Sequence, residues 1–104
     1  MTHQELQNFL KTSTGLPWAY HHFEKPPGIP FGVFADIAPT EIYADNTTYH
    51  RGNAYRLELY SVVRDVDYET MLEAALTAAD IPYEVDYTYI NSEKMYETIY
   101  EIEV

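Results

Sequence analysis

The sequence predicts an α+β fold, in which a mostly antiparallel sheet of about five strands has two helices packed on one of its faces. Two segments carry apolar residues at helical spacing, one near the N-terminus and one in the second half of the chain. The segments that follow each of them alternate apolar and polar residues, as half-buried strands do. No repeat, linker or low-complexity segment interrupts the 104 residues, so a single domain is expected over 1–104.

The first helix is indicated by its cap. Residues 2–5, "THQE", form a capping box in which Thr2 is the N-cap and Glu5 reaches back to it. Leu6, Phe9 and Leu10 then fall on one helical face. Gly15 suits the end of such a helix, so a short amphipathic helix is expected over about 3–13.

Three stretches of the first half predict strands. Residues 18–24, "WAYHHFE", are rich in aromatic side chains, and the "KPPGIP" that follows predicts a loop because it holds three prolines and a glycine. Further strands are expected over 31–38 and about 53–63, with a short strand and a turn over 40–50 between them. Alternation places Arg56 and Glu58 on one face of the long strand. It gathers the apolar positions on single faces, namely Phe31, Val33, Ala35 and Ile37 in one strand and Tyr55, Leu57, Leu59 and Val63 in the other.

The second half predicts a helix and a hairpin. Residues 64–82, "RDVDYETMLEAALTAADIP", have acids in the first turn, where Asp65 or Asp67 can cap, and a proline at the end. Two alternating segments, "YEVDYTYI" and "MYETIYEIEV", follow on either side of "NSEK", which predicts a β-hairpin. The apolar stripe expected for the helix is Met71, Leu72, Ala75, Leu76 and Ala79.

Alternation divides this hairpin into a tyrosine-rich face and an acidic face. Glu84 is predicted to lie opposite Glu101 across the hairpin, and like charges placed in this way are expected to stay in water. The tyrosine-rich face takes Tyr83, Val85, Tyr87, Tyr89, Tyr96, Thr98, Tyr100 and Ile102. The acidic face, a candidate lumen or interface surface, takes Glu84, Asp86, Glu97, Glu101 and Glu103.

The charge is concentrated in the C-terminal part of the chain. The net charge is −11: residues 1–64 hold six acids and five bases, and residues 65–104 hold eleven acids and one base. Without a basic footprint the chain is not expected to bind nucleic acid directly, and anionic membranes should repel it. The acidic part therefore indicates a solvated surface, a basic protein partner or a surface that repels nucleic acid.

Features of targeting and of the oxidising compartments are missing from the sequence. No apolar run approaches the roughly 18 residues of a membrane span. The N-terminus has neither a basic nor an apolar region of the signal-peptide kind. The chain has no cysteine, which excludes disulfides and thiolate metal sites and suits the cytoplasm.

Motifs of nucleophilic catalysis and phosphate binding are also missing. No serine stands in a GxSxG elbow, and neither GxxxxGK[ST] nor GxGxxG occurs. The "YHRGN" at 49–53 suits a β-turn around Gly52, or a protruding loop whose Arg51 pairs with an acid of a neighbouring subunit. The candidate assembly loop comprises Asp45, Asn46, Tyr49, His50, Arg51 and Asn53.

A metal site built on histidines is a further alternative. It would combine His21 or His22 with His50 and an acid, either Asp36 or Asp45. His21 and His22 are adjacent and would point to opposite faces of a strand, so one of them at most would join a given site. No HExxH or similar spacing accompanies them.

The order of these segments resembles a known group of proteins. A short helix leads into "GLPWAYHHFE", followed by a proline-rich break and "YADNTTYHRGNAYRLELYS". Next come "DYETMLEAALTAADIPYEVDYTYI" and the closing "SEKMYETIYEIEV". This order is similar to that of small head–tail morphogenesis proteins, of the tail terminator or head–tail joining type, from long-tailed phages and prophages of Gram-positive bacteria.

The resemblance covers nearly the whole chain and implies a structural protein. Members form a ring, commonly a hexamer, that caps the tail tube and docks to the head–tail connector. The resemblance implies no enzyme activity and no cofactor, with localisation in the cytoplasm of the bacterial host during assembly and then in the virion. Two rivals stay open: an acidic protein-binding module or DNA mimic that inhibits a basic host protein, and a small metal-dependent enzyme.

Overall fold

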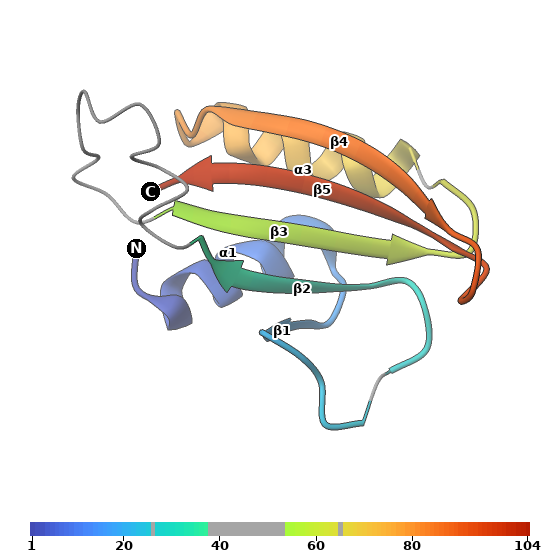
Figure 1. Cartoon of the computed structure of the whole chain (residues 1–104). Coiled ribbons are helices and arrows are strands. Elements are labelled where there is room, and N and C mark those ends of the chain that lie inside the picture. The colour runs from blue at the N-terminus through green and yellow to red at the C-terminus, as the bar shows by residue number, and fades with distance from the viewer. Residues whose placement is uncertain (26, 38–53, 65) are drawn as a thin grey trace, which may run out of the picture.

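The protein is α+β, and its described residues form two helices and a five-stranded mixed sheet (Figure 1). The computed structural model describes residues 1–25, 27–37, 54–64 and 66–104. The strands lie in the order β1-β2-β3-β5-β4, with β1 and β2 parallel and the other three neighbouring pairs antiparallel. The elements are α1 (His3–Thr14), β1 (Trp18–Tyr20), β2 (Phe31–Asp36), β3 (Ala54–Ser61), α3 (Val66–Ala78), β4 (Tyr83–Ile90) and β5 (Met95–Glu103).

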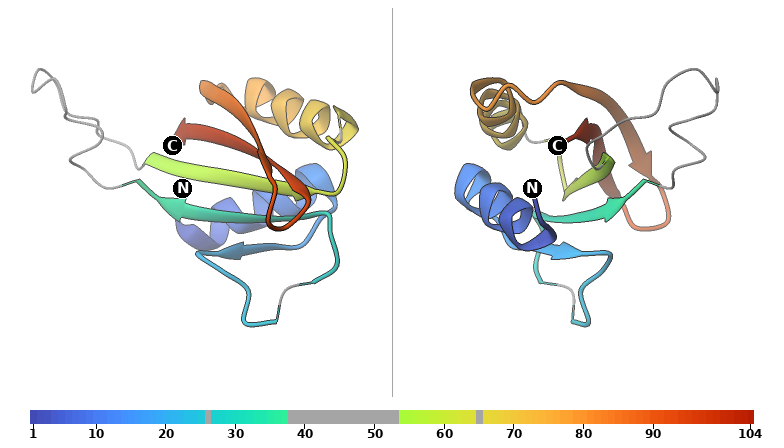
Figure 2. Two further views of the ribbon diagram at one scale, coloured as in Figure 1. Left: turned by 45° about the vertical axis from the view of Figure 1, so that its right-hand side comes forward. Right: turned by 90° about the vertical axis from the view of Figure 1, so that its left-hand side faces the viewer.

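α1 and α3 lie side by side on the same side of the sheet (Figure 2). We call this side the helix-covered face, and the other side, which neither of these helices covers, the open face. The core lies between the helices and the helix-covered face. Leu6 and Leu10 of α1 and Leu72 and Leu76 of α3 are fully buried there. They pack with strand residues of that face, namely Trp18, Phe34, Tyr55, Leu57, Leu59, Tyr100 and Ile102.

α1 forms as the sequence predicts. The capping box is present, because the Glu5 N–H donates to Thr2 Oγ1 at 3.1 Å and the Thr2 N–H donates to Glu5 Oε1 at 2.8 Å. The bond from the Thr2 N–H to the Glu5 carboxylate, followed by the effect of the Thr2 hydroxyl, lowers the pKa of Glu5. Gly15 closes the helix at a φ of 72°, a left-handed conformation that glycine adopts without strain.

A tight contact joins the first two strands. Trp18 and Gly32 are partners across the parallel pair, and a Cβ on Gly32 would lie closer than 3.0 Å to the indole ring of Trp18. The ring is buried, and its Nε1–H donates to Thr14 Oγ1 at 2.9 Å. Only glycine at position 32 therefore leaves room for this indole against the sheet.

Three predicted strands are longer than the observed ones. The strand predicted over 31–38 ends at Asp36, so Ile37 lies outside β2. β1 ends at Tyr20, because His21 takes a φ of 67° and its backbone turns away before the prolines. The prediction of a strand over 18–24 was therefore wrong beyond its first three residues. β3 ends at Ser61, and the side chain of Val63, predicted to face the core, is 66% exposed.

The buried face of α3 also differs from the predicted stripe. Leu72 and Leu76 are buried as expected, but Met71 is 40% exposed and Ala79 lies beyond the end of the helix. The third buried residue of this helix is Glu69, which a hydrophobicity pattern cannot indicate because its burial depends on the ion pair with Arg64.

Candidate functional site

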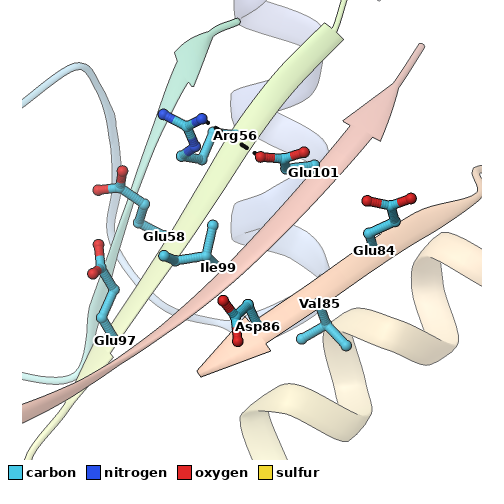
Figure 3. Close-up of a pocket in the computed structure, with 8 residues that line it drawn as sticks. All are labelled: Arg56, Glu58, Glu84, Val85, Asp86, Glu97, Ile99 and Glu101. Atoms are coloured by element: carbon cyan, nitrogen blue, oxygen red, sulfur yellow. Dashed lines mark hydrogen bonds and ion pairs between the residues drawn. The ribbon is translucent and has the colours of Figure 1, made fainter. Parts of the chain in front are cut away.

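The open face of the sheet brings the predicted acidic residues together. In the register of the final hairpin, Glu84 lies opposite Glu101, as the sequence predicts, and both side chains are exposed. Asp86 of β4 and Glu97 of the neighbouring strand β5 lie on the same face. A groove of about 530 Å³ runs between these side chains across β3, β5 and β4 (Figure 3). We call it the acidic groove.

Two residues of β3 complete the acidic groove. Arg56 and Glu58 line it together with the hairpin acids, and Arg56 Nη2 lies 3.5 Å from Glu101 Oε1. The sequence places both on the face of β3 away from the core. It does not show that β5 inserts between β3 and β4, and this strand order brings them beside Glu97 and Glu101. Glu103 pairs with Ala54 at the end of the sheet, away from the groove lining.

One tyrosine stands between two carboxylates in this region. The Tyr60 hydroxyl lies 2.6 Å from Glu58 Oε2 and 2.8 Å from Glu97 Oε2. A phenol has one proton to donate, so it satisfies only one carboxylate at a time. Burial, followed by the charge of Glu58, raises the pKa of Glu97 against the lowering effect of the Tyr60 bond. Burial and the two carboxylates also raise the pKa of Tyr60.

A second groove, mainly apolar, adjoins the first on the open face. It encloses about 590 Å³ beside the loop that joins β1 to β2. Phe23 meets Phe31 edge to face at 5.5 Å between ring centroids, and Phe31 stacks on Tyr60 at 5.2 Å. Glu58 lines both grooves and so marks their junction. Val33, Ile90, Met95, Glu93, His21 and His22 complete much of the lining of this apolar groove.

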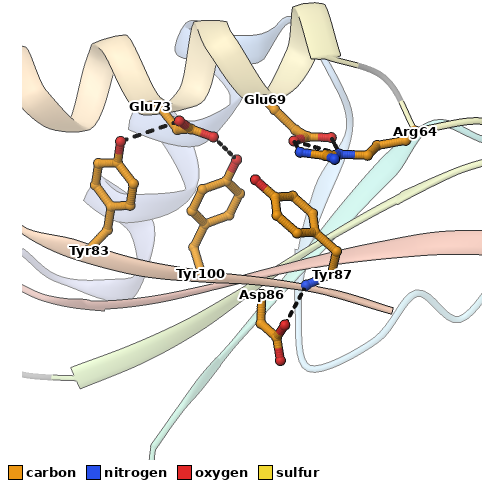
Figure 4. Close-up of polar contacts among 7 residues, drawn as sticks. All are labelled: Arg64, Glu69, Glu73, Tyr83, Asp86, Tyr87 and Tyr100. Atoms are coloured by element: carbon orange, nitrogen blue, oxygen red, sulfur yellow. Dashed lines mark hydrogen bonds and ion pairs between the residues drawn. The ribbon is translucent and has the colours of Figure 1, made fainter. Parts of the chain in front are cut away.

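The helix-covered face carries polar contacts of another kind (Figure 4). Glu73 of α3 accepts hydrogen bonds from two hydroxyls, that of Tyr100 at 2.7 Å and that of Tyr83 at 3.3 Å. Burial, followed by the bond to Glu73, raises the pKa of Tyr100. These contacts join α3 to the hairpin and have a structural role.

The buried Glu69 is held by an arginine at the start of α3. Its side chain is 4% exposed and lies 3.3 Å from the guanidinium of Arg64. That guanidinium also stacks on the ring of Tyr87 of β4, 3.7 Å from the ring centroid. Arg64 thus connects Glu69 of α3 with Tyr87 of the edge strand β4.

The other predicted site residues have different outcomes. Those of the candidate assembly loop lie outside the described residues: Asp45, Asn46, Tyr49, His50, Arg51 and Asn53. Asp36 was one of the two acids considered for a metal site built on histidines. Its carboxylate accepts a hydrogen bond from the Tyr20 hydroxyl, and its Oδ1 lies 3.3 Å from His3 Nε2. Among the residues that the structure describes, no group of three or more His, Cys, Asp or Glu is arranged to hold a metal ion.

Comparisons with known proteins give no relative: no family model, curated protein or solved structure matches the chain. In the described part of the chain, neither helix is long and apolar enough to cross a membrane.

Proposed function

We propose that this chain is a non-enzymatic structural protein of a phage or prophage, of the tail terminator or head–tail joining type. It self-assembles into a ring, with a hexamer as the expected size, and docks to the tail tube or the connector. The assembly forms in the cytoplasm of the bacterial host and is carried in the virion. The order of the sequence segments suggests this role, and the exposure of one strand supports it.

The main supporting observation is the exposure of β4. Its six residues from Glu84 to Tyr89 are all exposed, although they belong to a regular strand. In the described part of the chain β4 is an edge strand that pairs only with β5, and Tyr87 and Tyr89 are 40% and 45% exposed. Unpaired edges and exposed tyrosines are typical of surfaces that another chain covers. Self-association through β4 would cover both.

Exposed aliphatic side chains near the start of α3 add to this surface. Val62, Val63 and Val66 are 59%, 66% and 59% exposed. They flank Arg64, whose guanidinium stacks on Tyr87 of β4. Apolar surface of this kind, rimmed by polar residues, is characteristic of contact regions between subunits.

The acidic groove has a place in the same proposal. DNA has to pass a tail channel without binding to its wall, and a wall of carboxylates repels phosphate. We therefore assign the acidic residues of the open face to a lumen or to the contact with another subunit, one of the tail tube or the connector. Tail assembly and DNA passage that survived reversal of all five charges would contradict this role. The residues to reverse are Glu84, Asp86, Glu97, Glu101 and Glu103.

The second candidate is an acidic module that binds a basic protein as a DNA mimic. Its supporting observation is the regular spacing of carboxylates on the open face. Glu84 and Asp86 lie two residues apart on β4, and Glu97 and Glu101 lie on the same face of the adjacent β5. Rows of this kind can imitate phosphates in a basic groove. A monomer or dimer that binds a nuclease or a polymerase would favour this alternative.

Solution mass separates the two candidates. We would measure it by light scattering over a concentration series, with an electron micrograph of the largest species. Rings with a central hole are the expected result. A strict monomer at every concentration would contradict spontaneous self-assembly. Val85→Thr/Tyr89→Thr keeps strand propensity while it removes exposed apolar surface, so it should weaken ring formation and leave the fold intact.

A further inference from the structure

We infer that the open face docks an extended segment of another protein, with an apolar anchor in the apolar groove and a neighbouring arginine or lysine at Glu58 and Glu97. The inference goes beyond ring formation, because described residues of a single chain line both grooves. It therefore holds for a monomer as well as for a ring.

The apolar groove has the character of an anchor site. Its floor includes Val33, which is 8% exposed, and its wall includes the stacked rings of Phe31 and Tyr60. Pockets for peptide side chains combine such apolar walls with a few polar groups that fix orientation. Here the polar groups include Glu58 and Glu93, both of them acids.

Charge complementarity identifies the partner segment as basic. The described residues that line the two grooves include six carboxylates and one guanidinium, that of Arg56. A second copy of this chain would bring a net charge of −11 toward this face, which disfavours it as the occupant. The six acids are Glu58, Glu84, Asp86, Glu93, Glu97 and Glu101.

The junction of the grooves favours a cation in a defined place. Glu58 and Glu97 compete for the one proton of Tyr60, so one carboxylate is left without it. A guanidinium brings several N–H donors in a planar fork and can serve both carboxylates together. Because Glu58 also lines the apolar groove, an arginine bound there would lie beside the anchor residue in the same segment.

Selection from a random peptide library tests this inference while the partner is unidentified. Immobilised wild-type chain is used to select from a random dodecapeptide library by mRNA display, and an enriched peptide is then synthesised. Its dissociation constant is measured by fluorescence anisotropy. Enriched peptides should combine an aromatic or aliphatic residue with neighbouring arginine or lysine, and their affinity should fall as the salt concentration rises.

Matched variants locate the binding site. Met95→Glu places a charge in the apolar groove, and Met71→Glu makes the same change on the exposed side of α3. Glu58→Gln/Glu97→Gln removes two charges at the junction. Thr12→Lys/Thr70→Lys changes the net charge by the same amount at exposed positions on the helices. The first variant of each pair should weaken binding at least about tenfold, and its control less than about twofold.

Three outcomes would overturn the inference. These outcomes are a selection that enriches no peptide, enriched peptides without basic residues, and peptides that bind Met95→Glu as tightly as the wild type. If Met95→Glu abolished self-association while no peptide bound, the occupant would be a second copy. Urea unfolding followed by the emission of Trp18, the sole tryptophan, confirms that each variant is folded. Ring formation is measured separately, so failure here leaves the proposed function standing.

Discussion

Tyrosines meet carboxylates on both faces of the sheet, but in opposite proportions. On the helix-covered face two hydroxyls, of Tyr83 and Tyr100, donate to the single carboxylate of Glu73. On the open face the single hydroxyl of Tyr60 lies between the carboxylates of Glu58 and Glu97. Hydroxyl donors therefore outnumber carboxylates in the Glu73 cluster, and carboxylates outnumber hydroxyl donors in the Tyr60 cluster.

On the helix-covered face the carboxylate of Glu73 has its hydrogen-bond donors within the chain, whereas on the open face two carboxylates share one donor. Among the described residues, no buried side-chain nitrogen or oxygen lacks a hydrogen-bond partner, so the interior is complete within one chain. The open face instead holds acids close together, and that arrangement becomes favourable when a cationic partner arrives.

Packing on the helix-covered face should tolerate least change. Gly32→Ala places a Cβ closer than 3.0 Å to the indole of Trp18 and should lower the free energy of unfolding by about 3 kcal/mol. Gly28→Ala is the matched control, because its Cβ would meet nothing within 4 Å. Urea unfolding of both variants is the measurement. Equal stabilities of the two variants would contradict the described fit between β1 and β2.

Removing the charge of Glu73 should destabilise the protein. Glu73→Gln weakens the two charge-assisted bonds from Tyr83 and Tyr100, at a cost of about 1 to 2 kcal/mol in the free energy of unfolding. Chemical denaturation at pH 7 measures the change. An unchanged midpoint would show that these tyrosines do not depend on the carboxylate.

The same substitution on the open face should have the opposite sign. Glu97→Gln removes a partly buried charge beside Glu58, and we expect a gain of about 0.5 kcal/mol at pH 7 after solvent screening is allowed for. The free energies of unfolding of Glu97→Gln and Glu73→Gln, measured under identical conditions, compare the two faces directly. A loss of stability as large as that of Glu73→Gln would remove the distinction between the two faces.

The pH dependence of stability sharpens the contrast further. The native pKa of Glu97 is raised above its usual 4.5, so the native state binds this proton more tightly than the unfolded state does. The contribution of Glu97 to stability therefore decreases as the pH rises from about 4.5 through the raised native value. Urea midpoints at several pH values should show this decrease in the wild type and a smaller one in Glu97→Gln.

Glu5 provides an internal control of opposite sign. Its native pKa is lowered, so its stabilising contribution is complete above the usual value of 4.5 and is lost as the pH falls through the lowered one. Glu5→Gln should abolish that loss at low pH and leave the dependence due to Glu97 unchanged. Identical pH profiles of Glu5→Gln and Glu97→Gln would contradict both assignments.

Local features of the fold could be predicted from the sequence. The capping box of α1 and the hairpin register that sets Glu84 opposite Glu101 depend on nearby residues, and both predictions are confirmed. The end of β1 at Tyr20 was missed, because the left-handed conformation of His21 has no sequence signal as strong as a glycine. The burial of Glu69 was missed because it depends on Arg64.

The candidate site was predicted only in part, because it depends on strand order. The acids of the hairpin were identified by alternation along β4 and β5. The contributions of Arg56, Glu58 and Tyr60 require β3 to pair with β5, and no local pattern specifies that pairing. The apolar groove likewise depends on the loop between β1 and β2 lying beside the end of the hairpin.

The central claim is that this chain assembles through its exposed edge while its open face meets a lumen or another protein. An electron cryo-microscopy map of the largest species in solution tests it most directly. The account predicts a ring in which β4 contacts the neighbouring subunit and Glu84 and Asp86 face the hole or an adjoining surface. A ring with β4 uncovered and these two acids on its outer rim, or no ring at any concentration, would contradict the account.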